Sequence, residues 1–410
     1  MTQKQPPPLS WPIWILAAGR LLSQIGTGFT LFYAPIFFVN QVGFSATAVG
    51  IALGSQSVSG VLGRFLGGMF VDSPQWGRRK TLLLSAAISA LADVFLAATY
   101  NYPTLLIGNL LMGLGIGFYW PATEAAVADL TTREQRNEAY AITRLADTVG
   151  LGLGTVIGGT LITFAGNYRL LFILDGVSFV VFFGIIYFAI QETYNFAAQS
   201  ETMTQGWQKA FRDRALMVYV AVNILFTTYI SQTQSTLPLY FSNFANPPEG
   251  EGFAAQTISI LIAFHIVFAA ICQLPLARFL NRFSRPHALI FSQLLWGVGF
   301  LGIGLTGQIR SGTIIAAIAA LIFLSLGMIA YTPSASSLVA DLAPESLRGV
   351  YLSINSQCWA IGYFIGPMFG GWAMDQSPPV AHGFWVILAI STAVGTGILL
   401  YLQRLMRVES

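Results

Sequence analysis

The sequence predicts an all-α integral membrane protein in which twelve transmembrane helices form two pseudo-symmetric bundles of six. Three observations predict this fold: an apolar composition, a series of long apolar runs and an internal repeat. Of 410 residues, 55% are hydrophobic and only 9% are charged, and the mean hydropathy is +0.66. Soluble domains carry about 25% charged residues, so this composition places the chain in a lipid bilayer.

The apolar runs have the length of membrane-spanning helices. About 20 residues of α-helix cross the hydrocarbon core, whereas the strands of a membrane barrel are about half as long and alternate polar with apolar residues. The runs in this chain do not alternate, and mostly short polar turns separate them. We expect helices over residues 12–38, 46–71, 81–99, 103–128, 137–164, 169–191, 215–241, 254–280, 287–306, 312–338, 350–374 and 383–404.

The internal repeat divides the chain into halves. Residues 121–159 recur at 333–371, an offset of 212 residues without a gap, and eleven of the 39 aligned residues are identical. An offset close to half the chain length indicates duplication. We therefore expect an N-terminal six-helix bundle (1–190), a cytoplasmic linker (191–215) and a C-terminal six-helix bundle (216–410). Within the linker, residues 207–215 form either a short amphipathic surface helix or a solvated loop.

The basic residues predict the orientation. If the N-terminus is inside, fifteen lysines and arginines fall on the inner side and two on the outer side. The positive-inside rule then places both termini in the cytoplasm, in a multi-pass protein of the cell (plasma or inner) membrane. The first apolar run, Trp11 to Val39, is too long for a signal peptide, so we expect it to be retained as a helix.

Composition also excludes several classes of function. The formal net charge is only +3, with no basic run interleaved with aromatic residues, so no nucleic-acid partner is expected. Three histidines and two cysteines give no metal site and no pair of nucleophile and base, so we expect neither an enzyme nor a cofactor. The partners predicted are the lipid bilayer and a small-molecule substrate with protons, and we expect a monomer.

The loop after the second predicted helix contains a charged motif. It reads Gly68-Met-Phe-Val-Asp72-Ser-Pro-Gln-Trp-Gly77-Arg78-Arg79-Lys80. The aspartate can pair with basic residues at neighbouring helix ends while Gly68 lets the helices approach, which together form a latch for one conformation. Alternatively, the three basic residues serve only to set the topology.

A glycine pattern occurs in both copies of the repeat. In the first it comprises Gly150, Gly154, Gly158 and Gly159, and in the second Gly362, Gly366, Pro367, Gly370 and Gly371. Small residues four apart let helix backbones approach closely, and a proline allows a kink. These stretches suit a gating interface, at which the two halves of the protein move against each other. Alternatively, they serve only tight helix packing.

Twelve helices in two repeats, the charged loop and the glycine pattern resemble the major facilitator superfamily of secondary transporters over essentially the whole chain. The resemblance implies alternating access to a central substrate site. The glycine pattern resembles the one associated with exporters in the family, which has proline where this chain has Thr155, whereas the second copy has Pro367. Asn109 stands where many members have an arginine.

Charges expected at membrane depth are concentrated in the first half. Each costs about 2.5–3.5 kcal/mol unless it is paired or hydrated, so each is a functional candidate. At the positions aligned with Glu124, Arg144 and Asp147 the second half has uncharged residues. The proton-coupling candidates are Arg20, Asp93, Glu124, Arg144 and Asp147.

Structural roles compete with coupling for several of these residues. Arg144 and Asp147 are three apart on one helix and can neutralise each other. Glu124 can be hydrated near a helix end, and Asp175 can form a surface pair with Arg169. Arg20 either faces the substrate cavity or pairs with one of the carboxylates.

Two further ion pairs and one histidine are candidates for structural or functional roles. In the turns that follow the repeated proline, Asp129 can pair with Arg136, and Asp341 with Arg348. His265 is either a core histidine or a proton relay.

By resemblance, the first, fourth, seventh and tenth helices line the substrate cavity. They offer Tyr33, Tyr119, Trp120, Asn223, Tyr229, Gln232, Gln234 and Tyr331. Aromatic and amide groups suit an apolar or amphipathic substrate held by a few hydrogen bonds. The sequence therefore predicts a proton-coupled exporter of small hydrophobic or amphipathic compounds. The alternative is a proton symporter that takes up a small nutrient or metabolite.

Overall fold

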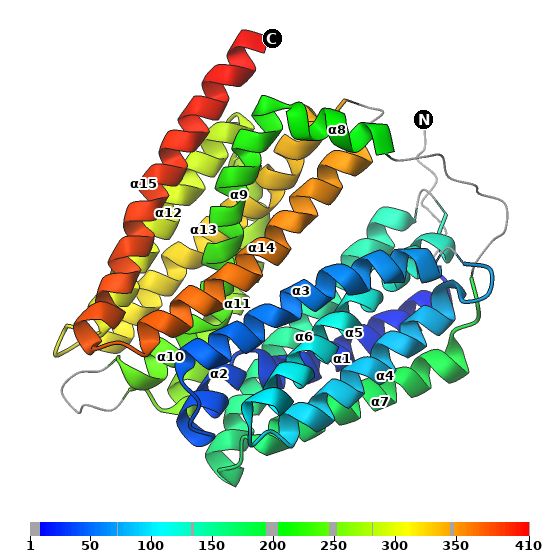
Figure 1. The fold of residues 1–410 in the computed structure, drawn as a ribbon, viewed down its shortest axis with the longest axis horizontal. Coiled ribbons are helices and arrows are strands. Elements are labelled where there is room, and N and C mark those ends of the chain that lie inside the picture. Colours follow the sequence, from blue (N-terminus) through cyan, green and yellow to red (C-terminus); the bar gives the residue numbers. More distant parts are fainter. Residues whose placement is uncertain are drawn as a thin grey trace. The chain divides into compact units, whose positions relative to one another are not determined.

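A computed structural model describes residues 9–71, 73–132, 135–193, 204–245, 252–280, 282–344 and 348–409, and within these ranges the regular structure is helical. The chain divides into two compact units. The first comprises Met1–Phe44 and Ala52–Gln199, and the second comprises Ser45–Ile51 and Ser200–Ser410. Figure 1 shows the helices of the first unit in blue to green and those of the second in green to red.

The first unit holds the helices of the N-terminal half. In chain order they are α1 (Trp11–Leu31), α2 (Ala34–Ile36), the π-helical turn η1 (Phe37–Gln41), α3 (Ala46–Val71), α4 (Gly77–Ala97), α5 (Tyr102–Asp129), α6 (Arg136–Ala165) and α7 (Arg169–Ala189). The first residues of α3 belong to the second unit by the division above.

The second unit holds the remaining helices. They are α8 (Thr204–Arg212), α9 (Arg214–Gln234), α10 (Thr236–Asn243), α11 (Ala255–Leu280), α12 (Arg285–Thr306), α13 (Thr313–Leu342), α14 (Arg348–Met374) and α15 (Pro378–Glu409). The short helix α8 overlaps the stretch in which the sequence left a surface helix and a loop as alternatives, and it contacts α9 and α14.

Each unit repeats the same internal pattern of helix packing. In the first unit α4 packs on α5 and α7, and α1 packs on α6 and α7. In the second, α12 packs on α13 and α15, and α9 packs on α14 and α15. Duplicated sequence therefore gives duplicated helix packing within each unit.

The helices have the length and surface of membrane spans. Within the described residues, eleven helices are long and apolar enough to cross a bilayer. The remaining predicted run, 350–374, corresponds to α14. Large apolar side chains such as Val94, Val180, Phe188, Ile315 and Ile390 are exposed on helix surfaces, where lipid can solvate them.

Two predicted helices break where the sequence analysis expected continuous runs. The first breaks at Phe32 and Tyr33 between α1 and α2, and the seventh at Ser235 between α9 and α10. In each case a proline lies four residues after the last helical residue: Pro35 after Leu31, and Pro238 after Gln234. A proline lacks the N–H that would bond to that carbonyl and its ring clashes with it, so the helix ends there.

The core of each unit lies between its packed helices. In the first unit, Leu82, Tyr119, Ala122 and Phe182 are among the buried side chains of α4, α5 and α7. In the second, Trp296 and Phe300 of α12 meet Tyr229 of α9 at centroid distances of 5.9 Å and 5.2 Å. These contacts fix the faces that each helix turns inward and thereby place the polar residues described next.

Candidate functional site

An ion pair inside the first unit joins α1 to α6. Arg20 Nε donates to Asp147 Oδ1 at 3.0 Å, and Arg20 Nη2 donates to Asp147 Oδ2, so the pair has two hydrogen bonds. Arg20 Nη1 also donates to Thr123 Oγ1 of α5 at 3.3 Å. Arg20 is 1% exposed and Asp147 14%. Two bonds between a guanidinium and a carboxylate are a strong, directional contact, and here they hold a buried charge.

A second ion pair joins α5 to α6 and is more exposed to solvent. Arg144 Nη2 donates to Glu124 Oε1 at 2.8 Å, with the two side chains 57% and 46% exposed. The Tyr140 hydroxyl of α6 donates to the backbone carbonyl of Glu124 at 3.0 Å. This pair can therefore exchange its partners with solvent more easily than the Arg20–Asp147 pair.

The indole of Trp120 links the two pairs. The guanidinium carbon of Arg20 lies 5.7 Å from its ring centroid, and that of Arg144 lies 4.8 Å away. Both distances are within the range of cation–π attraction. We call Arg20, Trp120, Glu124, Arg144 and Asp147 the charge network of the first unit.

Helix periodicity explains how α5 and α6 supply this network. Trp120 and Glu124 are four apart on α5, and Arg144 and Asp147 are three apart on α6, so each pair shares a helix face. The two residues of α6 take partners on different helices, Asp147 on α1 and Arg144 on α5. The interpretation that Arg144 and Asp147 neutralise each other is therefore wrong, whereas the pairing of Arg20 with a carboxylate is found.

The glycines of the first repeat bring α6 against α1. A Cβ on Gly150 would lie 2.8 Å from Gln24 Cβ, and one on Gly158 would lie 3.1 Å from the Tyr33 ring. A Cβ on Gly154 would overlap the Ile25 carbonyl. Close approach at these glycines is what allows the Arg20 guanidinium to reach Asp147. Gly159 is also buried.

The glycines of the second repeat make the corresponding contacts in the second unit. Cβ atoms on Gly362 and Gly366 would overlap the hydroxyls of Thr227 and Ser231 on α9, and one on Gly370 would overlap Thr236 on α10. The glycines of each repeat make these contacts within their own unit. This agrees with a role in tight helix packing. A role in gating stays a prediction.

Two further glycines bring the first residues of α3 against α14. A Cβ on Gly371 would overlap the carbonyl of Ala46, and one on Gly50 would overlap the carbonyl of Pro367. Beside it, the Asp375 carboxylate accepts from the backbone N–H of Ala46 at 2.6 Å and of Thr47 at 2.7 Å. Asp375 therefore caps the start of α3, and all of these residues belong to the second unit.

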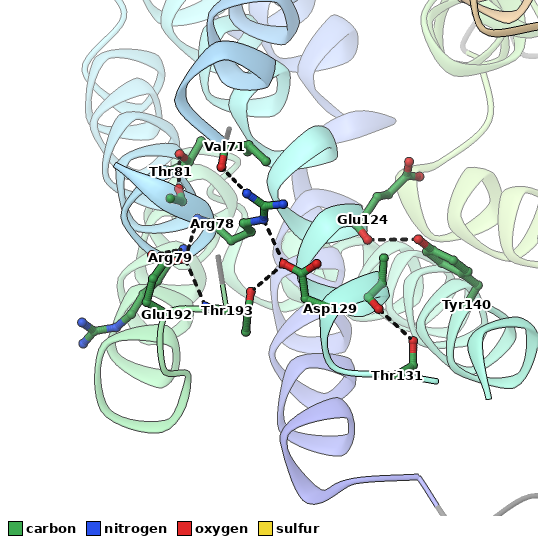
Figure 2. A network of polar contacts seen from close by, with 12 residues as sticks. Val71, Arg78, Arg79, Thr81, Glu124, Asp129, Thr131, Tyr140, Glu192 and Thr193 are labelled. Carbon is green, nitrogen blue, oxygen red and sulfur yellow. Dashed lines mark hydrogen bonds and ion pairs between the residues drawn. The ribbon is translucent and has the colours of Figure 1, made fainter. Parts of the chain in front are cut away.

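The charged loop after α3 forms a polar network around Arg78 (Figure 2). Arg78 Nε donates to Asp129 Oδ2 at 2.9 Å, and Arg78 Nη1 donates to the Val71 carbonyl at 2.6 Å. The Glu192 carboxylate accepts from the backbone N–H groups of Arg78 at 2.9 Å and Arg79 at 3.2 Å, at the start of α4. These contacts tie the ends of α3, α4, α5 and α7 together.

Gly77 in this loop has a left-handed backbone conformation. Its φ is +70°, and a Cβ there would overlap the Glu192 carboxylate. A Cβ on Gly68, by contrast, would meet nothing within 4 Å. Asp72, the acidic member of the predicted latch, lies outside the described residues, so the latch stays a prediction.

Each of the two turn aspartates has an arginine partner among the described residues. Asp129 pairs with Arg78, and Asp341 lies 4.0 Å from Arg285 Nε at the start of α12. The two turns thus have the same arrangement, an aspartate at the end of one helix and an arginine at the start of the preceding one. The side chains of Arg136 and Arg348 lie outside the described residues, so the predicted pairs Asp129–Arg136 and Asp341–Arg348 stay predictions.

Most residues predicted to line a substrate cavity are buried and bonded within their own unit. The Tyr331 hydroxyl donates to Asn223 Oδ1 at 2.7 Å, and Asn223 Nδ2 donates to Asn355 Oδ1 at 2.9 Å. The Tyr219 hydroxyl donates to the same Asn355 oxygen at 2.7 Å. Sequence reasoning missed Asn355 and Tyr219, and only their positions on helices in the apolar runs marked them as unusual polar groups.

Three more of the predicted lining residues are hydrogen-bonded within their own unit. The Tyr33 hydroxyl donates to the Thr155 carbonyl at 2.9 Å, and Tyr229 shares a hydrogen bond of 2.7 Å with Ser391. Gln232 Nε2 donates to the Gly366 carbonyl at 2.9 Å. Tyr119 is buried beside Arg20, and Gln234 is half-buried near the end of α9. A role in substrate binding stays a prediction for all of them.

Asp175 and His265 are also placed by the structure. Asp175 is buried and accepts from Thr30, so its predicted surface pair with Arg169 is wrong. The Arg169 guanidinium instead donates to the backbone carbonyls of Ala97 and Thr99. His265 Nδ1 shares a hydrogen bond of 2.6 Å with Ser325, as a core histidine does.

Comparison with known proteins identifies the family. A family model described as Major Facilitator Superfamily matches residues 16–254 and 243–409. The multidrug resistance proteins MdtH of Salmonella arizonae and Salmonella typhimurium are each 24% identical over 382 residues, which cover 92% of this chain and 90% of the relative.

Solved structures share the fold. The nucleoside transporter NupG superposes with a TM-score of 0.81 at 14% identity, covering 96% of this chain and 99% of NupG. A bacterial homolog of the human lysosomal transporter Spinster superposes with a TM-score of 0.75 at 13% identity, covering 96% of each chain.

Proposed function

Because the chain belongs to the major facilitator superfamily, and is therefore a multi-pass secondary transporter of small molecules, we propose that it is a proton-coupled exporter of small hydrophobic or amphipathic compounds. The transport cycle proposed is alternating access, in which the two repeats rearrange about a substrate site. Both termini lie in the cytoplasm in this proposal, in agreement with the distribution of basic residues.

The charge network of the first unit is the observation that supports proton coupling best. It holds two carboxylates and two guanidiniums on α1, α5 and α6. The aligned residues of the second repeat are Ser336, Ser356 and Trp359, so this chemistry is absent from the matching positions there. Ionisable groups kept within transmembrane helices despite their cost are functional by default.

The proposed coupling step is a change of partner at Asp147. When Asp147 is ionised, it holds Arg20 by two hydrogen bonds. A proton on Asp147 removes the charge that attracts Arg20 and blocks one acceptor oxygen, so the link between α1 and α6 weakens. Glu124, which is more exposed, is the group through which we propose that protons exchange with solvent.

Efflux rather than uptake is supported by two observations. Relatives at 24% identity are multidrug resistance proteins, and the second repeat carries the complete glycine and proline pattern ending at Gly371. The alternative is a proton symporter that takes up a small nutrient or metabolite, because the charge network serves either direction equally.

A vesicle experiment separates the two directions. The purified protein is reconstituted, a pH gradient is imposed, and the movement of cationic dyes, nucleosides and short peptides is recorded together with internal pH. Opposite movement of dye and protons supports the exporter. Movement of a solute and protons in the same direction would establish the symporter instead.

A further inference from the structure

Two aspartates of the first unit lie close together, away from the charge network. Asp93 of α4 and Asp175 of α7 are each 1% exposed. Gly176 brings their helices into contact, because a Cβ built on it would lie 3.2 Å from Asp93 Cβ and 4.0 Å from Asp93 Oδ2. The two carboxyls are near enough for their charges to repel each other.

Asp93 has no visible means of holding a negative charge. Both of its carboxyl oxygens are buried, and neither has a hydrogen-bond partner among the described residues. Burying an ionised carboxylate without a partner is among the most unfavourable arrangements in a protein interior, and a second carboxylate beside it adds repulsion. The two carboxyls are therefore stable in this arrangement only when they bind at least one proton or other cation.

Asp175 has partners that suit either of its protonation states. The Thr30 hydroxyl of α1 lies 2.9 Å from Asp175 Oδ2 and 3.2 Å from the Thr27 carbonyl. A hydroxyl holds one proton, so Thr30 can donate to only one of these oxygens at a time. With Asp175 ionised, Thr30 donates to it. With Asp175 protonated, Asp175 donates to the Thr30 oxygen and Thr30 donates to the Thr27 carbonyl.

The space for this exchange depends on a glycine of α1. A Cβ on Gly26 would overlap both Asp175 Oδ1 and Ser178 Oγ. The Ser178 hydroxyl lies 3.5 Å from Asp175 Oδ1, one turn along α7. Side chains of three helices thus surround the pair, with the hydroxyls of Thr30 and Ser178 beside Asp175.

The charged groups of the surrounding helices are engaged elsewhere. On α7, Arg169 donates to backbone carbonyls at the end of α4 and lies six residues before Asp175, about 9 Å along the helix axis. On α1, Arg20 pairs with Asp147, and on α5, Glu124 pairs with Arg144. On α4 itself, the basic residues Arg78, Arg79 and Lys80 are in its first turn, at the opposite end from Asp93.

We propose that Asp93 and Asp175 together bind one exchangeable proton, and that the Thr30 hydroxyl switches its hydrogen bond as the proton moves. No covalent bond other than those to this proton changes. Binding of the proton is a property of the pair alone. Its use in the transport cycle, as a protonation site separate from Asp147, rests on the proposed function.

Infrared spectroscopy of the purified protein tests the pair without any substrate. A protonated carboxyl has a carbonyl stretch that a carboxylate lacks, and the band shifts in deuterium oxide. We expect this band in the wild type at neutral pH, a shifted band in Asp175→Asn, where Asp93 stays buried and protonated, and loss of the band in the double variant Asp93→Asn with Asp175→Asn. The band should be retained in Asp341→Asn, a matched change at an exposed carboxyl. Absence of the band from the wild type, or its persistence in the double variant, would overturn the proposal.

One further variant and one salt titration test the role of Thr30 and the identity of the bound ion. Thr30→Val retains both carboxyls and is expected to move the band, since Asp175 loses its hydroxyl partner; an unmoved band would remove Thr30 from the switch. Titration with sodium chloride against choline chloride distinguishes the ion. Loss of the band with sodium alone would show that the pair binds sodium in place of a proton, which contradicts the proposal.

Transport separates this inference from the proposed function. In vesicles, the double variant Asp93→Asn with Asp175→Asn is expected to keep exchange of substrate for substrate and to lose accumulation driven by a pH gradient. Unchanged accumulation would exclude the pair from coupling. A wild-type protein that moves no solute would refute the proposed function, and the infrared result would still decide whether the pair binds a proton.

Discussion

Arg20 and Asp147, which are 127 residues apart in the chain, form a two-bonded ion pair that ties α1 to α6 with the arginine almost fully buried. Removing one partner of a buried pair leaves an uncompensated charge. We expect Asp147→Asn to lower the free energy of unfolding by about 3–5 kcal/mol. The joint change Arg20→Met with Asp147→Leu should cost less than either single change. Thermal or denaturant unfolding in detergent measures both, and a fully stable Asp147→Asn protein would show that the pair does not hold the helices.

The Glu124–Arg144 pair should behave differently, because both side chains are about half exposed. Exposed ion pairs contribute about 0–1 kcal/mol, so Glu124→Gln is expected to leave unfolding nearly unchanged. Proton-driven transport should nevertheless fall if Glu124 exchanges protons with solvent. Unfolding and vesicle transport, measured on the same preparation, check whether Glu124→Gln lowers transport without lowering stability. The matched control is Glu138→Gln, since Glu138 is an exposed residue in the first turn of α6.

Trp120 lies near both guanidiniums, at 5.7 Å and 4.8 Å from its ring centroid. Trp120→Leu removes both cation–π contacts, each worth about 0.5–2 kcal/mol, whereas Trp120→Phe keeps an aromatic face. The leucine variant should therefore be less stable than the phenylalanine variant. Equal unfolding temperatures for the two would show that the ring contributes only apolar packing.

Two glycines of the charged loop form a matched pair for a backbone test. Gly77→Ala places a side chain at a φ of +70° and against Glu192, so a loss of stability of more than about 1 kcal/mol is expected. Gly68→Ala adds a Cβ with nothing within 4 Å, at a helical position, and should be neutral or stabilising. The reverse order of stability would contradict the geometry described around Arg78.

The Asp375 carboxylate caps the first turn of α3 through the N–H groups of Ala46 and Thr47. Loss of a cap costs about 0.5–2 kcal/mol, which is the effect expected for Asp375→Ala. Asp375→Asn retains one acceptor oxygen and should cost less. Hydrogen exchange at the Ala46 and Thr47 amides gives the local readout, and unchanged protection in the alanine variant would exclude the cap.

The sequence predicted the fold because helix length and apolar composition are local properties. Ten of the runs correspond to single helices, and the other two break four residues before Pro35 and Pro238. Proline alone does not identify these breaks in the sequence, because Pro121, Pro275, Pro333 and Pro367 lie inside continuous helices. The close approach of α6 to another helix also followed from glycine spacing, since small residues at this spacing permit it whichever helix is the partner.

Pairing of Arg20 with a carboxylate was one of the predicted alternatives, but which carboxylate it takes, and the partners of the other charged residues, did not follow from the sequence. Spacing on one helix suggested that Arg144 would neutralise Asp147, and sequence proximity suggested Arg169 for Asp175. The partner of Arg144 is Glu124, on the preceding helix α5, and the partners of Asp147 and Asp175 are Arg20 and Thr30, both on α1. Which helix faces meet is decided by the packing of whole bundles, and local spacing contains no information on that choice.

Accumulation of a cationic dye in vesicles under an imposed pH gradient tests the central claim, that the charge network couples protons to substrate. The comparison is between the wild type and Asp147→Asn, each shown to be folded by its elution as a single species. The account predicts dye movement that depends on the gradient in the wild type and is lost in the variant. Gradient-driven movement of the same rate and extent in the variant would contradict it.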